Sequence, residues 1–155
     1  NRLMLLKPLI SETITEYKPK IFLRNDEIET AEQLLKKHNI IYGEKPLIMF
    51  GILGSEWYKT YPLENMAKLI DFTVEKLEAN VIFNYIPSQI EEAQKVYKFC
   101  SDKTKKNIHF DLYSEGLRPF LALLSRCSML IGNEGGAVNM AKALSVPTFS
   151  LFPAV

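Results

Sequence analysis

The chain has 155 residues, of which 47% are hydrophobic and 24% charged, values typical of one globular domain with a full core. Its formal net charge of +1 gives no general attraction to nucleic acid or to an acidic membrane, so we expect any anion site to be local. No apolar run is long enough to span a bilayer. The two cysteines, Cys100 and Cys127, are isolated in the sequence, which favours buried thiols and argues against a metal site.

Residues 1–44 are interpreted as a lead-in segment or linker that contains one helix. The part before residue 26 is irregular, with two prolines, Pro8 and Pro19, and an apolar run at residues 21–23 that could form a strand. A helix is predicted over residues 26–38, because Asp26 can cap its first turn and apolar residues recur on one face.

From residue 45 onward, short apolar runs alternate with amphipathic stretches. The apolar runs predict five strands, at residues 46–50, 80–86, 107–110, 128–132 and 146–152. The amphipathic stretches predict helices at residues 62–79, 88–100 (capped by Ser88), 117–126 and 135–144. This alternation indicates an α/β domain over residues 45–155, with a Rossmann-like parallel sheet between two layers of helices. We expect the strand order 3-2-1-4-5, because right-handed crossovers leave few topologies.

The strand order predicts where a ligand would bind. In open parallel sheets, ligands bind beyond the carboxyl ends of the strands, where the order reverses. In the expected order this point lies between the first and fourth strands, which residues 51–61 and 133–136 follow. These loops are also the most chemically distinctive stretches of the sequence.

The first loop combines groups that suit a diphosphate. Gly54 permits close approach of the backbone, Ser55 offers a hydroxyl, and Lys59 offers a cation just before a helix. A surface loop with a solvated lysine explains the same spacing equally well. The aromatic cluster in this loop (Trp57, Tyr58 and Tyr61) can stack on a base or sugar, or contact a further domain, although a covered hydrophobic edge is the simpler interpretation.

In the second loop, Gly135 and Gly136 open a helix, so its free N–H groups should point toward the ligand. Glu134 could bond a sugar hydroxyl, pair with Lys59 or cap the helix. Asn139, one turn on, could face the ligand or only pack. Neither loop contains the G-x-G-x-x-G fingerprint of dinucleotide-binding proteins or the G-K-[ST] ending of a Walker A loop.

At these residues the sequence resembles glycosyltransferase family 9, the ADP-heptose:lipopolysaccharide heptosyltransferase family, which has a two-domain GT-B fold. The family carries a loop ending K-x-W-P, and Lys59-Thr60-Tyr61-Pro62 stands in that place with Tyr for Trp. The family motif N-D-[ST]-G-x-x-H-x-A-x-A-L-x-x-P keeps its frame over residues 133–147, and the next strand ends in Phe152-Pro153, as in the family. The resemblance covers residues 45–155.

The resemblance implies the donor-binding half of an enzyme that transfers a sugar from a nucleotide diphosphate donor, such as ADP-heptose, to lipopolysaccharide or another glycan. Lys59 would neutralise the diphosphate, with help from Ser55 and the loop backbone. Gly135 and Gly136 would present N–H groups to the phosphate or the sugar.

The remaining family positions concern the sugar and the nucleoside. Glu134 takes the place of the family's aspartate, near the donor sugar. Ser88 and Gln89 lie where the family contacts the nucleoside. Asn139 replaces the family's histidine, and asparagine can form hydrogen bonds but cannot carry a positive charge. The donor could therefore differ from ADP-heptose.

The resemblance also implies partners that this chain lacks. The family's acceptor-binding domain, with its catalytic base, would precede this segment, and the family continues past the last predicted strand. We therefore expect a fragment that is inactive alone. We expect no metal, no cofactor and no nucleic-acid partner, and a cytoplasmic location at the inner face of a bacterial membrane. Two alternatives stay open: another GT-B-like enzyme such as a nucleotide-sugar epimerase, and a non-enzymatic module that binds a nucleotide or a protein.

Overall fold

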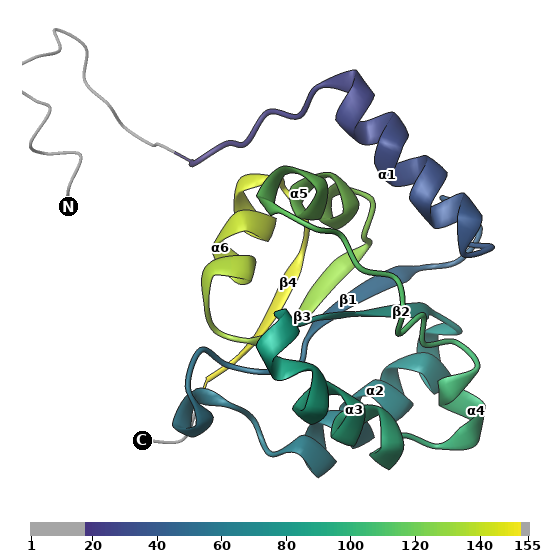
Figure 1. Cartoon of the computed structure of the whole chain (residues 1–155), viewed down its shortest axis with the longest axis vertical. Coiled ribbons are helices and arrows are strands. Elements are labelled where there is room, and N and C mark those ends of the chain that lie inside the picture. Colours follow the sequence, from purple (N-terminus) through teal and green to yellow (C-terminus); the bar gives the residue numbers. More distant parts are fainter. Residues whose placement is uncertain (1–17, 153–155) are drawn as a thin grey trace, which may run out of the picture.

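Four parallel strands form the centre of the protein in the computed structural model, which describes residues 18–152 (Figure 1). The sheet order is β2-β1-β3-β4. The strands are β1 (Leu47–Gly51), β2 (Asn80–Asn84), β3 (Met129–Asn133) and β4 (Thr148–Leu151). The predicted α/β class and parallel sheet are confirmed, but the described residues form four strands rather than five.

The predicted third strand, residues 107–110, is one isolated bridge. Ile108 pairs in parallel with Val81 at the outer side of β2, and the His109 N–H donates to the Val81 carbonyl at 2.9 Å. The Leu112 N–H then donates back to the His109 carbonyl at 3.1 Å, so the chain turns away from the sheet at once. The predicted order 3-2-1-4-5 is therefore present, except that the predicted third strand is reduced to a single bridge.

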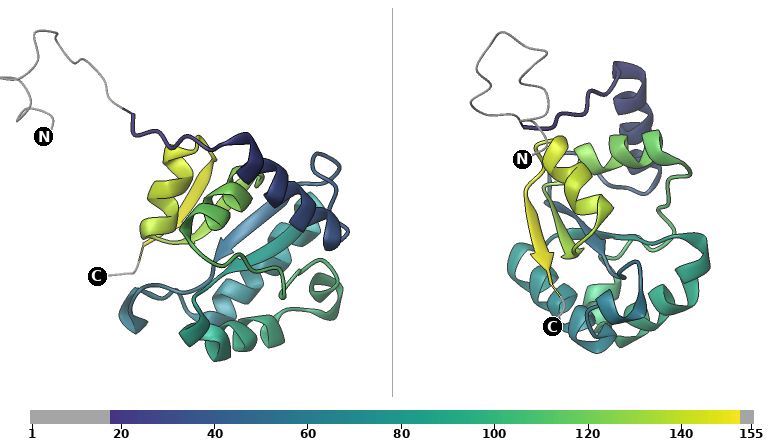
Figure 2. Two further views of the ribbon diagram at one scale, coloured as in Figure 1. Left: turned by 45° about the horizontal axis from the view of Figure 1, so that its top comes forward. Right: turned by 90° about the vertical axis from the view of Figure 1, so that its left-hand side faces the viewer.

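Helices cover both faces of the sheet, as the views in Figure 2 show. One face packs against α2 (Leu63–Leu77) and α3 (Ile90–Phe99), with the short α4 (Asp102–Lys105) beyond them. The other face packs against α1 (Asn25–Lys37), α5 (Leu117–Ser125) and α6 (Gly136–Ala143). Two single-turn 3-10 helices, η2 (Trp57–Lys59) and η3 (Pro87–Gln89), lie in the loops after β1 and β2.

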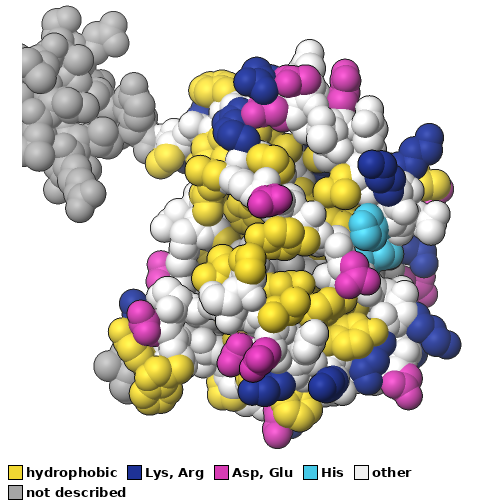
Figure 3. All heavy atoms as spheres, in the orientation of Figure 1, with side chains coloured by type: hydrophobic (Ala, Val, Ile, Leu, Met, Phe, Trp, Pro, Cys, Tyr) yellow, Lys and Arg dark blue, Asp and Glu magenta, His cyan; other side chains and the backbone are white. Residues whose placement is uncertain are grey.

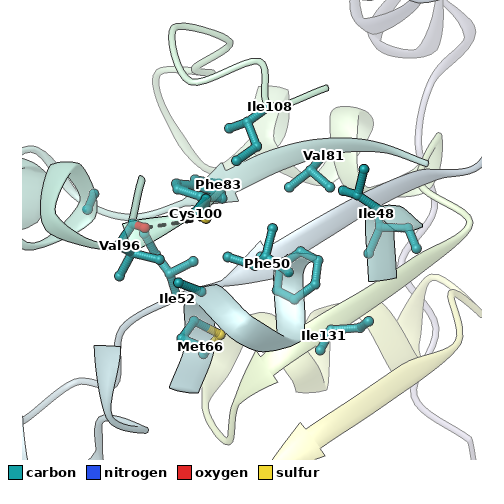
Figure 4. Packing of buried hydrophobic residues seen from close by; sticks show 14 of the residues in the cluster. Ile48, Phe50, Ile52, Met66, Val81, Phe83, Val96, Cys100, Ile108 and Ile131 are labelled. Carbon is teal, nitrogen blue, oxygen red and sulfur yellow. Dashed lines mark hydrogen bonds between the residues drawn. The ribbon is translucent and has the colours of Figure 1, made fainter. Parts of the chain in front are cut away.

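Strand β1 shows how the sequence specifies this layering. Ile48 and Phe50 face α2 and α3, where they pack with Val81 and Ile131 of the neighbouring strands (Figure 4). Met49 faces the opposite layer. All five residues of β1 are buried, as expected for a strand that is covered on both faces.

Helix α1 packs along α5 and is joined to it by an ion pair. Its Leu35 is buried in the same core as α5 and α6. The Glu27 carboxylate accepts hydrogen bonds from the Arg118 guanidinium, with Nε at 2.7 Å, and from the Arg24 backbone N–H at 2.8 Å. Helix α1 therefore begins at Asn25 with Glu27 bonding its first turn, and the predicted cap at Asp26 is wrong. The boundary between residues 44 and 45 stays a prediction.

Smaller predictions have mixed outcomes. The apolar run at residues 21–23 forms no strand, although the Ile21 N–H donates to the Ala143 carbonyl at 2.9 Å. Cys100 and Cys127 are buried, as expected, and burial raises the pKa of the Cys100 thiol to about 12 and also raises that of Cys127. No helix within residues 18–152 is long and apolar enough to cross a membrane. The predictions that involve Pro8 and Pro153 lie outside the described residues.

Strands β1 and β3 approach each other very closely at their carboxyl ends. Gly51 pairs with Gly132 in the register of the sheet. A Cβ atom added to Gly132 would lie 2.3 Å from the Gly51 carbonyl oxygen and 2.7 Å from its nitrogen and Cα. Only glycine fits at position 132, where the strands that lead into the two loops singled out by the sequence meet.

We predict that Gly132→Ala lowers the free energy of unfolding by about 1–3 kcal/mol, because the new methyl group meets backbone that cannot move aside without opening the sheet. Denaturant unfolding measures this change. Gly136→Ala is the matched control, because its Cβ would meet only the Met140 methyl group, at an ordinary 3.8 Å. Equal stability of both variants would show that the two strands can separate without cost.

We also predict that acid weakens the α1–α5 contact. Arg118, followed by the Arg24 backbone N–H, lowers the pKa of Glu27 from 4.5 to about 2. A lowered carboxyl pKa stabilises the fold above pH 4.5, and this contribution is lost as the pH falls toward 2. Unfolding free energies measured between pH 5 and 3 should therefore fall less steeply in Arg118→Met than in the wild type. Lys105→Met, which removes the exposed pair with Asp102, should keep the wild-type slope.

Candidate functional site

The candidate site lies at the carboxyl edge of the sheet, where the strand order reverses between β1 and β3. Two segments leave this point. We call residues 52–61 the Lys59 loop, and residues 134–136 lead from β3 into α6. Because β1 and β3 are neighbours, the two predicted halves of the site start side by side.

The buried side chain of Asn133 links these two segments. Its Oδ1 accepts a hydrogen bond from the Tyr61 N–H at 2.7 Å, and its Nδ2 donates to the Gly51 carbonyl at 3.1 Å. The side chain is only 7% exposed. Asn133 lies within the sequence motif, but its residue type and spacing gave no indication of this contact between segments more than seventy positions apart.

The Lys59 loop is folded tightly on itself. The Gly54 N–H donates to the Thr60 hydroxyl at 3.0 Å, and that hydroxyl donates to the Glu56 carbonyl at 3.0 Å. A Cβ atom on Gly54 would lie 2.5 Å from the Lys59 carbonyl oxygen. The glycine predicted to approach a ligand is therefore also needed for the loop to close.

Gln89 holds the same loop from η3, the 3-10 helix that follows β2. Its Nε2 donates to the Gly54 carbonyl at 3.2 Å, and its Oε1 accepts from the Ile86 N–H at 3.2 Å. The structure thus brings Gln89 and Gly54 together. Ser88 is exposed and does not cap α3, since the helix begins at Ile90 after a 3-10 turn, so the predicted cap is wrong.

Lys59 and Ser55 are both exposed to solvent on the Lys59 loop. The Lys59 ammonium lies 5.7 Å from the centroid of the Tyr58 ring. Within the described part of the chain, no carboxylate lies within ion-pairing distance of Lys59. The suggested pair between Lys59 and Glu134 is therefore not formed, and the ammonium is accessible to an anion.

The amino end of α6 is open. Gly135 occupies the N-cap position and no side chain caps the helix, so the suggested capping role of Glu134 is not formed. A Cβ on Gly135 would meet nothing within 4 Å. Glu134, Gly136 and Asn139 are all exposed. The unpaired N–H groups of the first turn present a partial positive charge to this open space.

A pocket of about 400 Å³ adjoins α6 on the face that α5 covers, and sequence reasoning missed it. We call it the tyrosine pocket. Ala137 and Met140 of α6 form one wall, and the last residues of β2 form another. Its other lining residues include Tyr85, Tyr113, Ser114, Leu117 and Phe120. In the view of Figure 3, hydrophobic side chains gather across the middle of the molecule, between α5 above and α3 below as labelled in Figure 1.

Aromatic packing shapes one side of the tyrosine pocket. Tyr85 stacks on Phe110 with ring centroids 5.5 Å apart and lies 6.2 Å from Tyr113. Partial burial raises the pKa of the Tyr85 hydroxyl, helped by the negative charge of Asp111. The pocket therefore offers aromatic surface with a few uncharged polar groups. Its residues are scattered over two strands, two loops and two helices, and no sequence motif links them.

The Trp57 side chain belongs to the Lys59 loop, whereas the two histidines of the chain lie outside it. Trp57 is 86% exposed and meets Tyr58 edge-on at 5.8 Å. His38 lies at the end of α1, and His109 forms a 3.1 Å hydrogen bond with Asn80, which fits structural roles. Within residues 18–152, no group of three or more His, Cys, Asp and Glu side chains is arranged to hold a metal ion.

Comparison of the sequence with protein-family models and with curated proteins finds no match. Comparison of the structure with solved structures finds several matches. A glycosyltransferase family 9 protein from Veillonella parvula DSM 2008 has a TM-score of 0.78 and 22% identity, covering 95% of this chain and 41% of that chain. ADP-heptose LPS heptosyltransferase II from E. coli has a TM-score of 0.70 and 19% identity, and the match covers 86% of this chain and 39% of that chain.

A third similar structure is E. coli heptosyltransferase WaaC with ADP-2-deoxy-2-fluoro heptose, with a TM-score of 0.54 and 14% identity. The match covers 77% of this chain and 36% of that chain. The chain thus spans about two fifths of each of these proteins. The resemblance that the sequence motifs suggest is confirmed at the level of the fold, and this chain has the α/β fold of one part of a family 9 glycosyltransferase.

Proposed function

We propose that this chain is the part of a glycosyltransferase that binds the nucleotide-sugar donor, and that the whole protein transfers a sugar to a lipopolysaccharide or related glycan. The observation that carries the proposal is the open amino end of α6 beside the Lys59 loop, at the carboxyl edge of a parallel sheet. The likeness to the family 9 structures supports it at the level of the fold.

The diphosphate of the donor would lie between the two positive elements. The α6 amino end offers backbone N–H groups, and Lys59 offers an ammonium that no carboxylate of the described chain neutralises. Ser55 can add a hydroxyl from the same loop as Lys59. Both elements are local, which explains how a protein of formal net charge +1 could select an anion.

The nucleoside would occupy the tyrosine pocket. A volume of about 400 Å³ lies in the usual range of small-molecule sites. Tyr85 and Tyr113 offer aromatic surface for the base. Ala137 and Met140 of α6 line the pocket, so the amino end of this helix lies beside it. Gln89 would then support the Lys59 loop more than it touches the nucleoside, because its amide already bonds Gly54 and Ile86.

The reaction we infer for the whole protein is an inverting transfer. An acceptor hydroxyl, deprotonated by a base outside this chain, would attack the anomeric carbon and displace the nucleoside diphosphate. Negative charge grows on the leaving diphosphate during this step. Lys59 and the α6 amino end are already in place to stabilise that charge, without reorganisation as it develops. Glu134 and Asn139 would lie near the sugar.

We predict that the chain binds one of ADP, UDP and GDP, and that Lys59→Ala weakens this binding about tenfold, since a hydrogen bond to a charged group contributes about 1.5–3 kcal/mol. Isothermal titration calorimetry measures both affinities. The matched control is Lys68→Ala on α2, outside the site. Equal affinity of the wild type and Lys59→Ala would contradict the role of Lys59, and failure of all three nucleotides to bind would contradict donor binding by this chain.

We further predict that Ala137→Leu weakens binding of the nucleoside and of its diphosphate to a similar extent, because the larger side chain projects into the tyrosine pocket. Lys59→Ala should weaken only the diphosphate. Calorimetry with both ligands on both variants separates the two parts of the site. If Ala137→Leu left both affinities unchanged, the nucleoside would have to bind elsewhere.

A further inference from the structure

The side chain of Asn133 makes a connection that the proposed chemistry does not use directly. We propose that Asn133 is a positioning residue, whose amide fixes the Lys59 loop relative to the amino end of α6 so that both act on one anion. This inference rests on the proposed function, because it assigns the two elements to a common ligand. It concerns a residue that would not itself touch the donor.

The first support is where the two hydrogen bonds fall. Asn133 donates to the carbonyl of Gly51, the last residue of β1, and accepts from the N–H of Tyr61, the last residue of the Lys59 loop. One side chain therefore holds both ends of the loop that carries Ser55 and Lys59. The loop cannot swing away from the sheet without breaking one of these bonds.

The second support is the place of Asn133 in its own strand. It is the last residue of β3, and the N-cap of α6, Gly135, follows two positions later. The Glu134 N–H between them donates to the Leu151 carbonyl of β4 at 3.0 Å, which fixes the path of the backbone. The residue that holds the Lys59 loop is thus rigidly connected to the start of α6.

The third support is the chemistry of the side chain. An amide can accept from one backbone group and donate to another at once, whereas an aspartate can only accept. Burial keeps water from replacing either bond, so the loss of the amide would leave its backbone partners unpaired. An uncharged residue also avoids placing a negative charge beside the diphosphate.

Gln89 and Thr60 extend the same arrangement. Gln89 holds Gly54 in the middle of the loop, and the Thr60 hydroxyl bridges Gly54 and Glu56. Uncharged side chains thus fix the loop at its ends and its middle, while Lys59 is left exposed. The loop is set before any ligand arrives, so binding need not order it.

The test compares Asn133→Ala with Thr73→Ala in the full 155-residue chain. Thr73 is 5% exposed and its hydroxyl bonds the Leu69 carbonyl at 2.7 Å within α2, so its loss also removes a buried hydrogen bond but leaves the loop alone. The first readout is hydrogen–deuterium exchange. We expect the amides of residues 52–61 to exchange at least about tenfold faster in Asn133→Ala, and at the wild-type rate in Thr73→Ala.

The second readout is the affinity ratio between the best-binding nucleoside diphosphate and its nucleoside. We expect Asn133→Ala to lower this ratio about tenfold with nucleoside affinity unchanged, a result that a general loss of stability would not give. An unchanged ratio, or unchanged loop exchange, would overturn the positioning role. If the wild-type chain binds none of ADP, UDP and GDP, the proposed function fails, and the exchange readout alone decides whether Asn133 fixes the loop.

Discussion

The close contact between Gly51 and Gly132 is the constraint on which the rest of the site depends. The backbone at Gly132 lies so close to β1 that any side chain on it would overlap the Gly51 backbone. At that separation the side chain of Asn133 reaches across to both ends of the Lys59 loop. A wider spacing would break the link between the loop and α6, and the lysine and the helix end would then lie on independent segments.

The organisation of charge follows from this rigid frame. The protein as a whole is nearly neutral, with a formal net charge of +1. Among the described residues, Lys59 meets no carboxylate within ion-pairing distance and the amino end of α6 meets no capping side chain. Two local positive elements held in fixed positions suit a diphosphate better than a diffuse basic surface would.

The alternation of apolar runs was sufficient to predict the parallel sheet and its order, and with them the sheet edge at which a site is proposed. It failed at residues 107–110, where a strand-like run makes only one bridge because the chain turns at Leu112. It also misplaced the helix caps. Glu27, rather than Asp26, bonds the backbone at the start of α1, and Gln89, rather than Ser88, bonds the backbone of the turn before α3. The tyrosine pocket and the Asn133 contacts were beyond prediction, because they depend on residues that only the folded chain brings together.

The central claim is that one ligand spans the tyrosine pocket, the amino end of α6 and the Lys59 loop. The most direct measurement is a two-dimensional NMR titration of the isotope-labelled chain with ADP, UDP and GDP. The account predicts shifts of the backbone amides of residues 58–61, 113–117 and 135–138 that follow a single saturation curve for one nucleotide. Shifts confined to α1 and α2, or separate curves for the three segments, would contradict a common site.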